Sequence, residues 1–219
     1  MLERERERVA AAARRLAAAG LVAGTAGNVS ERGRDSERDL IAITPTGATL
    51  GKLEPGQVAV VDRDGHQRDG DLAPTSETEL HLGVYRRYDA GAVVHTHPPI
   101  GTALSCVLEE LPVIHYQMLL LGGPIRVAPY ATFGSPELAA VTLDALQDRA
   151  GALMANHGAI THGGDLDAAV EQSLLLEWAC EVYWRAAAIG TPSALDQDQR
   201  EAVVSAALAQ GYGTTRSAE

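Results

Sequence analysis

Cysteine is scarce in this chain, and long apolar runs are missing. Cys106 and Cys180 are the only cysteines, and neither has a neighbour that would complete a Cys-x-x-Cys pair. We therefore expect free thiols in a reducing cytoplasm rather than a disulfide framework. No apolar run reaches the ~20 residues that span a bilayer. Residues 1–8 are charged, so we expect no membrane anchor and no secretion signal.

Positive charge is also in deficit, since the formal net charge is -11. An acidic surface argues against nucleic acid or an anionic membrane as a partner, because both would repel it. An anionic substrate would have to be held locally, against the mean field of the protein. The 219 residues, 46% of them hydrophobic, suffice for one sizeable core. We therefore expect a single domain over residues 1–219.

The order of helix and strand signals predicts a layered α/β domain. Helices are predicted over residues 2–19, 76–88, 165–189 and 196–210, and from the cap Ser135-Pro136-Glu137 onward. Strands are predicted over residues 40–43, 57–61, 92–95, 125–128 and 152–155. Residues 24–30 are interpreted as a loop leading into irregular structure, and Asp64-Gly65 as a hairpin turn. Because the elements alternate without clear parallel crossovers, we expect a mixed sheet.

Two histidines at the end of an apolar strand carry the strongest chemical signal. Strand side chains alternate between faces, so His95 and His97 project together where Pro98 and Pro99 end the strand. Two adjacent imidazoles make half of a divalent-metal site. His157 also lies between an apolar strand and a glycine and is the candidate third ligand, although spacing alone does not place it beside His95. His66, His115 and His162 are interpreted as ordinary hydrogen-bonded groups.

Three short polar segments are candidates for binding an anion without lysine or arginine. Ser76 and Glu79 fit a capping box, which would place Ser76 at the N-cap and Glu77 beside the amides of the first turn. The alternative is a plain helix cap. Gly27-Asn28 and residues 44–47 offer turn amides with short polar side chains, which can cradle phosphate oxygens but also fill ordinary turns.

Taken together and in order, these motifs resemble the class II aldolase/adducin family, and the fuculose-phosphate aldolase branch in particular. The resemblance covers roughly residues 5–213. The segments that carry it are residues 24–30, 44–47, Ser76-Glu77, 95–97 and His157-Gly158, with residues 114–116, 128–134 and Tyr212-Gly213 matching that branch. Three departures are Ala209, where the aldolases carry an aromatic residue, the segment 96–99, where the neighbours of the histidine pair differ, and a longer loop over residues 31–39.

The resemblance implies a fold and a set of site residues. The fold is a three-layer α/β/α sandwich around a mixed, mainly antiparallel sheet. One zinc ion per subunit would be held by His95, His97 and His157, with Glu77 as the catalytic acid that can also reach the metal. Tyr116 and Tyr212 would line an active site between the subunits of a cytoplasmic homotetramer. The implied phosphate ligands are Gly27, Asn28, Thr46, Gly47, Thr75 and Ser76.

The implied activity is reversible cleavage of a ketose 1-phosphate similar to L-fuculose 1-phosphate. The products would be dihydroxyacetone phosphate and a small aldehyde such as lactaldehyde, with the aldehyde half left open. Alternatives on the same scaffold are dehydration of methylthioribulose 1-phosphate and epimerisation of a pentulose phosphate. The epimerases carry aspartate at the position of Glu77, which favours the aldolase. A non-enzymatic, adducin-like module is the remaining alternative, and it is expected to lack the three histidines.

Overall fold

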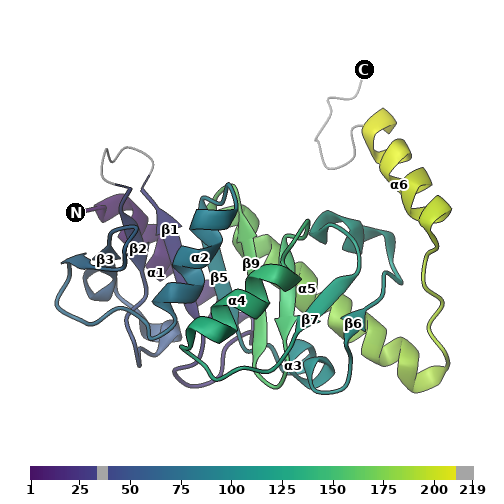
Figure 1. Cartoon of the computed structure of the whole chain (residues 1–219), viewed down its shortest axis with the longest axis horizontal. Helices are drawn as coiled ribbons and strands as arrows, with labels where there is room; N and C mark the ends of the chain where they lie inside the picture. The colour runs from purple at the N-terminus through teal and green to yellow at the C-terminus, as the bar shows by residue number, and fades with distance from the viewer. Residues whose placement is uncertain (34–38, 211–219) are drawn as a thin grey trace.

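A nine-stranded sheet forms the centre of the protein in the computed structural model, which describes residues 1–33 and 39–210 (Figure 1). Its strand order is β4-β3-β2-β1-β5-β9-β8-β7-β6. The strands are β1 (Asn28–Arg32), β2 (Ile41–Ile43), β3 (Ala59–Val61), β4 (Gln67–Asp69), β5 (Ala92–Thr96), β6 (Glu110–Leu111), β7 (Ile125–Ala128), β8 (Gly151–Met154) and β9 (Gly158–Gly163). β7 and β8 pair in parallel, and the other neighbours pair antiparallel. The predicted mixed, mainly antiparallel sheet is confirmed.

Helices cover both faces of this sheet (Figure 1). They are α1 (Glu3–Ala18), α2 (Thr78–Arg87), α3 (Pro99–Ser105), α4 (Pro136–Ala145), α5 (Leu166–Ile189) and α6 (Gln197–Gln210), with 3-10 turns η1 (Leu50–Lys52), η2 (Pro55–Gln57) and η3 (Tyr116–Leu121). Two neighbouring residues of β5 show the layering. Val93 is buried with residues of α2 and α4, whereas Val94 is buried with residues of α1 and α5. The expected three-layer arrangement is therefore confirmed.

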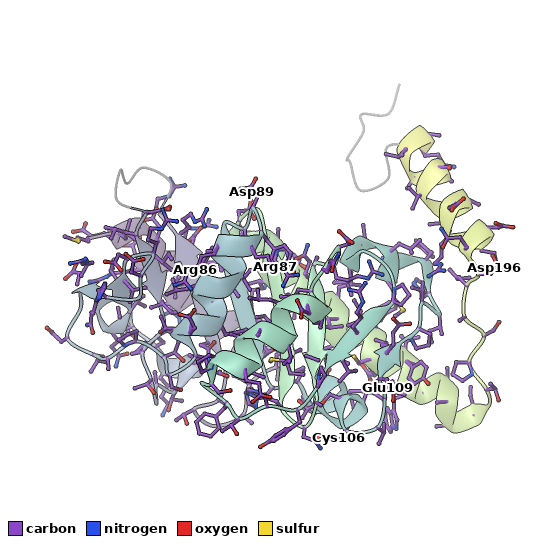
Figure 2. All side chains as sticks on the ribbon, viewed as in Figure 1. Arg86, Arg87, Asp89, Cys106, Glu109 and Asp196 are labelled. Carbon is purple, nitrogen blue, oxygen red and sulfur yellow. The ribbon has the colours of Figure 1, made fainter. Side chains whose placement is uncertain are left out.

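Several local signals act as the sequence predicts. Ser135 caps α4 by accepting a hydrogen bond from the Leu138 amide at 3.1 Å, with Pro136 at the first helical position. The turn through Asp64-Gly65 joins β3 and β4 as a hairpin. Cys106, which lies at the end of α3 (Figure 2), and Cys180 are both free thiols. Among the described residues, no helix combines the length and apolar character needed to cross a bilayer.

Two local predictions are wrong, and one strand was missed. Residues 28–32 form β1 rather than irregular structure, because β2 and β5 pair with them on both sides. Residues 158–163 form β9, which the glycines at both ends concealed. The N-cap of α2 is Glu77 instead of Ser76, and its side chain does not cap the helix. Thr75 Oγ1 accepts instead from the amide of Glu77 at 3.3 Å, and the Glu77 carboxylate contacts His95.

The surface of α2 and the position of α6 complete the arrangement. Arg86 and Arg87 lie in the last turn of α2 (Figure 2), where cations favour the helix dipole. Arg87 also pairs with Asp144 of α4 at 2.6 Å. α6 extends away from the sheet (Figure 1) and packs against η3, leaving Val204 and Leu208 exposed.

Candidate active site

The register of three adjacent strands assembles the candidate site. β1, β5 and β9 lie side by side, and His95 of β5 pairs with Asn28 on one side and Ile160 on the other. His97 follows the end of β5, and its amide donates to the carbonyl of Leu21 at 3.0 Å. His157 lies in the turn between β8 and β9. Residues far apart in the sequence therefore converge at the ends of the central strands of the sheet.

A close approach between backbones allows this convergence at Gly158. A Cβ atom at this position would lie 2.3 Å from the carbonyl oxygen of Thr96, so another residue would push β9 away from β5. Gly27 has a similar role on the opposite side, where its φ of +89° is left-handed and a Cβ would lie 3.0 Å from the carbonyl of His95. The glycines that the motifs contain are thus needed for packing around the imidazoles.

The three imidazoles of His95, His97 and His157 point toward one another. Their ring centroids lie 4.7–4.9 Å apart in every pairing. One ring nitrogen from each lies within 4.8 Å of those of the other two. The Nε2 atoms of His95 and His97 are only 3.0 Å apart. The structure therefore brings together the three predicted metal ligands.

The protonation of these rings fits a bound cation. The Nδ1 atom of His95 lies 2.9 Å from the carbonyl oxygen of Ala159, which can only accept, so Nδ1 donates to it and Nε2 is the nitrogen that faces the ring of His97. Burial, with a contribution from His95, lowers the pKa of His97 and of His157 to about 4, so both rings are neutral near pH 7. Three imidazole nitrogens that converge in this way make a suitable site for a divalent metal.

Glu77 joins this cluster from the N-terminal end of α2. Its Oε2 lies 3.1 Å from Nε2 of His95, and its Oε1 lies 3.5 Å from Nε2 of His157. Asn28 donates from Nδ2 to Oε2 at 2.9 Å, whereas the buried Oε1 has no hydrogen-bond partner among the described residues. Burial would raise the pKa of Glu77, but His95, Asn28 and His157 outweigh it and hold the pKa well below its ordinary value. An ionised carboxylate with one unsatisfied oxygen is suited to bind a cation or to accept a proton.

A pocket of about 310 Å³ opens over the carboxylate and two of the imidazoles. Besides Glu77, His97 and His157, its lining includes all six residues that the sequence predicts for phosphate, namely Gly27, Asn28, Thr46, Gly47, Thr75 and Ser76. They belong to three loops that meet at the N-terminal end of α2. Backbone amides, hydroxyl groups and the positive end of a helix dipole together favour an anion.

One pocket residue was missed from the sequence, one predicted residue lines another pocket, and one lies outside the described residues. Phe133 lines the pocket with 68% of its surface exposed, and its only sequence signal was a place within the matching segment 128–134. Tyr116 lies in η3 and lines a different, apolar pocket beside α6. Tyr212 lies outside the described residues. The site roles of both tyrosines stay predictions.

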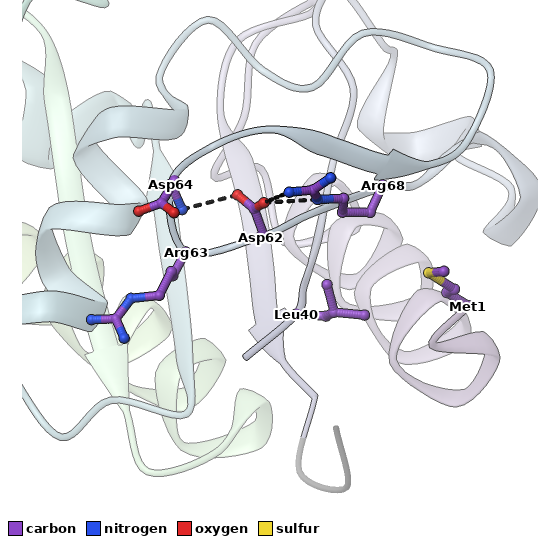
Figure 3. Close-up of a pocket in the computed structure, with 6 residues that line it drawn as sticks. All are labelled: Met1, Leu40, Asp62, Arg63, Asp64 and Arg68. Atoms are coloured by element: carbon purple, nitrogen blue, oxygen red, sulfur yellow. Dashed lines mark hydrogen bonds and ion pairs between the residues drawn. The ribbon is translucent and has the colours of Figure 1, made fainter. Parts of the chain in front are cut away.

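A second group of possible ligands, Asp62, Asp64 and His66, lies in the β3–β4 hairpin. Figure 3 shows its two aspartates. Both carboxylate oxygens of Asp62 already accept hydrogen bonds within this hairpin. Its Oδ2 accepts from Nε of Arg68 at 2.7 Å, and its Oδ1 accepts from the amides of Asp64 and His66 at 3.0 Å. This arrangement neutralises the carboxylate and stabilises the turn, so it needs no metal.

Comparison with known proteins identifies the family to which this geometry belongs. The family model described as the class II aldolase and adducin N-terminal domain matches residues 7–184. The chain belongs to this family. Within it, the histidine cluster and the curated relatives place the chain among the metal-dependent class II sugar-phosphate aldolases.

The similar proteins differ in the substrate that their names give. A 5-deoxy-D-ribulose 1-phosphate aldolase of Bacillus thuringiensis is 35% identical, over 97% of this chain and 99% of its own length. An L-fuculose phosphate aldolase of Escherichia coli is 38% identical, over 84% of this chain and 85% of its own. A solved L-fuculose 1-phosphate aldolase superposes with a TM-score of 0.87 at 31% identity, covering 93% of this chain and 95% of that chain. The family resemblance inferred from the motifs is confirmed.

Proposed function

We propose that this aldolase reversibly cleaves a deoxyketose 1-phosphate to dihydroxyacetone phosphate and a short aldehyde, with zinc as its metal. One observation carries the proposal: three converging imidazoles and Glu77 share a pocket with the three loops at the start of α2. The first group suits the ketone end of a sugar and the second suits a phosphate. The two groups are adjacent, as the adjacent phosphate and ketone of a ketose 1-phosphate require.

We take 5-deoxyribulose 1-phosphate as the first substrate and L-fuculose 1-phosphate as the second. The relative named for 5-deoxyribulose matches 97% of this chain, and that named for fuculose matches 84%. Both sugars end in a methyl group, and their aldehyde products, acetaldehyde and lactaldehyde, differ by one hydroxymethylene unit. A difference of this size is worth ~1–3 kcal/mol in a pocket.

The chemistry divides between a metal and the side chains of this chain. A divalent ion held by His95, His97 and His157 would supply Lewis acidity to the substrate's ketone oxygen. The loops that contain Asn28, Thr46 and Ser76 would hold the phosphate and so fix the sugar's position. When the bond between C3 and C4 breaks, C3 keeps the electron pair and the C4 hydroxyl loses its proton. Glu77, having first taken up a proton, would deliver it to C3, so one proton is released and one is consumed. In the reverse direction it would remove that proton.

We further propose a cytoplasmic homotetramer in which a neighbouring subunit completes each active site. Tyr116 and the aromatic tail residue Tyr212 would then donate to the aldehyde oxygen across the interface. Support comes from the apolar pocket between η3 and α6, which includes Leu120 and Leu208 among its exposed lining residues. Measuring the mass in solution tests the assembly, and a stable monomer would contradict it.

The activity is tested by following dihydroxyacetone phosphate with a coupled NADH-dependent reductase. We expect the zinc-loaded protein to release it from 5-deoxyribulose 1-phosphate, and more slowly from L-fuculose 1-phosphate. Methylthioribulose 1-phosphate distinguishes the alternatives, because dehydration would give one unsplit product. A pentulose 5-phosphate tests epimerisation. Release of no three-carbon phosphate from any of these ketose 1-phosphates would refute the proposal.

A further inference from the structure

A buried histidine behind the pocket, His81, lies one helical turn after Glu77 on α2. It is fully buried, and both of its ring nitrogens have partners. Nδ1 lies 2.7 Å from the hydroxyl oxygen of Ser30, and Nε2 contacts Oδ1 of Asn28. Asn28 in turn donates to Glu77. His81 is therefore connected to the carboxylate of the site without lining the pocket itself.

The direction of each hydrogen bond follows from the carboxylate. An ionised Glu77 can only accept, so Asn28 presents its NH2 group to it and turns Oδ1 toward His81. Because Oδ1 can only accept, Nε2 of His81 carries the proton. Nδ1 then accepts from the hydroxyl of Ser30. The Ser30 oxygen, 2.7 Å from the hydroxyl of Tyr85, accepts from that group in turn.

The surroundings of His81 and Tyr85 keep each side chain in the protonation state that these hydrogen-bond directions require. Burial, together with nearby His95, lowers the pKa of His81 to about 3, so the ring is neutral and has one donor and one acceptor. Burial raises the pKa of Tyr85 well above its ordinary value, so its hydroxyl keeps its proton. Arg32 lies over the ring of Tyr85, 5.0 Å from its centroid, and donates to its carbonyl at 2.8 Å. Each link in the chain from Tyr85 to Glu77 is thus matched.

We propose that His81 is a positioning residue for the aldolase reaction: it fixes the amide of Asn28 so that its NH2 group holds Glu77. If the amide turned over, its oxygen would face the Glu77 carboxylate and repel it. The Nε2 proton of His81 prevents this turnover of the amide, because the Asn28 atom that faces Nε2 must be a hydrogen-bond acceptor. That atom is therefore Oδ1. The effect on turnover rests on the proposed function, whereas the effect on Asn28 does not.

The first experiment compares crystal structures of the metal-loaded wild type, His81→Leu and His81→Gln. The amide nitrogen of glutamine can occupy the place of Nε2 and keep the donor. We expect the contact between Asn28 Nδ2 and Glu77 Oε2, 2.9 Å in the present structure, to persist in His81→Gln and to break in His81→Leu. An unchanged contact in His81→Leu would overturn the proposal, whichever substrate the enzyme uses.

The second experiment is a double-mutant cycle on turnover. His81→Leu should lower kcat by about 10- to 100-fold, with little change in KM, because misplaced groups lose orientation. His81→Gln should recover most of the loss. Since His81 acts through Asn28, it should add little in an Asn28→Ala background. Additive losses, or equal activity of the leucine and glutamine variants, would contradict a positioning role.

Two controls separate positioning from instability. His162→Leu removes another packed histidine, one that stacks on Tyr88 and bonds to the carbonyl of Arg149, and it should leave kcat unchanged. If His81→Leu does not fold, Ser30→Ala removes the partner of Nδ1, together with the acceptor of the Tyr85 hydroxyl, and should lower kcat to a lesser degree at unchanged KM. Ser30→Ala with wild-type kcat and an unmoved Asn28 would then count against the proposal. A wild type that cleaves neither sugar would refute the proposed function alone.

Discussion

His95 donates a hydrogen bond from Nδ1 to the carbonyl of Ala159, 2.9 Å away on the neighbouring strand β9. This contact fixes Nε2 as the nitrogen of His95 that faces the ring of His97. It also links the strand of the first two imidazoles to the segment that supplies the third. A carbonyl in this position commonly raises the basicity of a histidine ligand and fixes its ring.

Metal content should depend on the histidine cluster and not on the hairpin. We expect wild type to hold about one zinc per chain and His97→Ala to lose it, because two remaining imidazoles no longer enclose an ion. The loss in affinity should exceed the ~10- to 100-fold that outer-shell substitutions cost. Elemental analysis after gel filtration measures this. His66→Ala, which alters the second cluster, should keep the metal, and stoichiometric zinc in His97→Ala would refute the site.

Glu77→Gln should separate metal binding from turnover. Three histidines remain, so the variant should keep its metal, but an amide cannot take up a proton. Loss of a positioned acid or base typically costs about 10²–10⁴-fold in rate. The coupled assay measures kcat, with Glu79→Gln as the matched control because Glu79 is exposed and pairs with Arg86. Unchanged cleavage by Glu77→Gln would remove its proposed proton-transfer role.

Gly158→Ala should disturb both stability and the metal site. The new Cβ would lie 2.3 Å from the carbonyl of Thr96, so β9 would have to shift. Overpacking of this kind costs about 1–3 kcal/mol. Gly164→Ala is the control, because a Cβ there meets nothing within 4 Å. The thermal unfolding temperature and the metal content should both fall in Gly158→Ala and not in Gly164→Ala. Equal behaviour of the two variants would contradict the close approach of β9 to β5.

Asp62 should make the fold sensitive to acid. Burial would raise its pKa, but Arg68 and the amides of His66 and Asp64 lower it to about 2, below the ordinary value near 4. A lowered folded-state pKa stabilises the protein above pH ~4, and that contribution is lost as the pH falls from ~4 to ~2. Unfolding curves of Asp62→Asn should therefore show a smaller loss of stability over this interval. An identical pH dependence would refute the assignment.

The sequence predicted the fold class and the histidine pair better than the local path of the backbone around the site. Alternation along a strand was enough to pair His95 with His97, because that rule is local. The position of His157 depends on β9, whose glycines gave no strand signal, so its approach to His95 was a hypothesis supported by resemblance. Ser76 was wrongly taken as the N-cap because the capping-box pattern does not reveal that Thr75 bonds the Glu77 amide instead.

His81 shows a different limit of sequence reasoning. Its spacing of four residues from Glu77 predicts one helix face, but a buried histidine on an apolar face is usually a packing residue. Its significance depends on Asn28 and Ser30, which belong to a strand that was interpreted as irregular. Tertiary pairing, which no local pattern encodes, therefore determined the part of the site that was missed.

The pairing of β1, β5 and β9 also determines which changes in chain length the enzyme can tolerate. Deleting one residue inside β5 would rotate every later side chain of that strand to the opposite layer, and His95 would face the helices of the other side. Residues added to the hairpin beyond β3 would leave these three strands unaltered. Insertions or recombination points in this enzyme should therefore be placed in its turns. The number of residues within each of the three strands should stay unchanged.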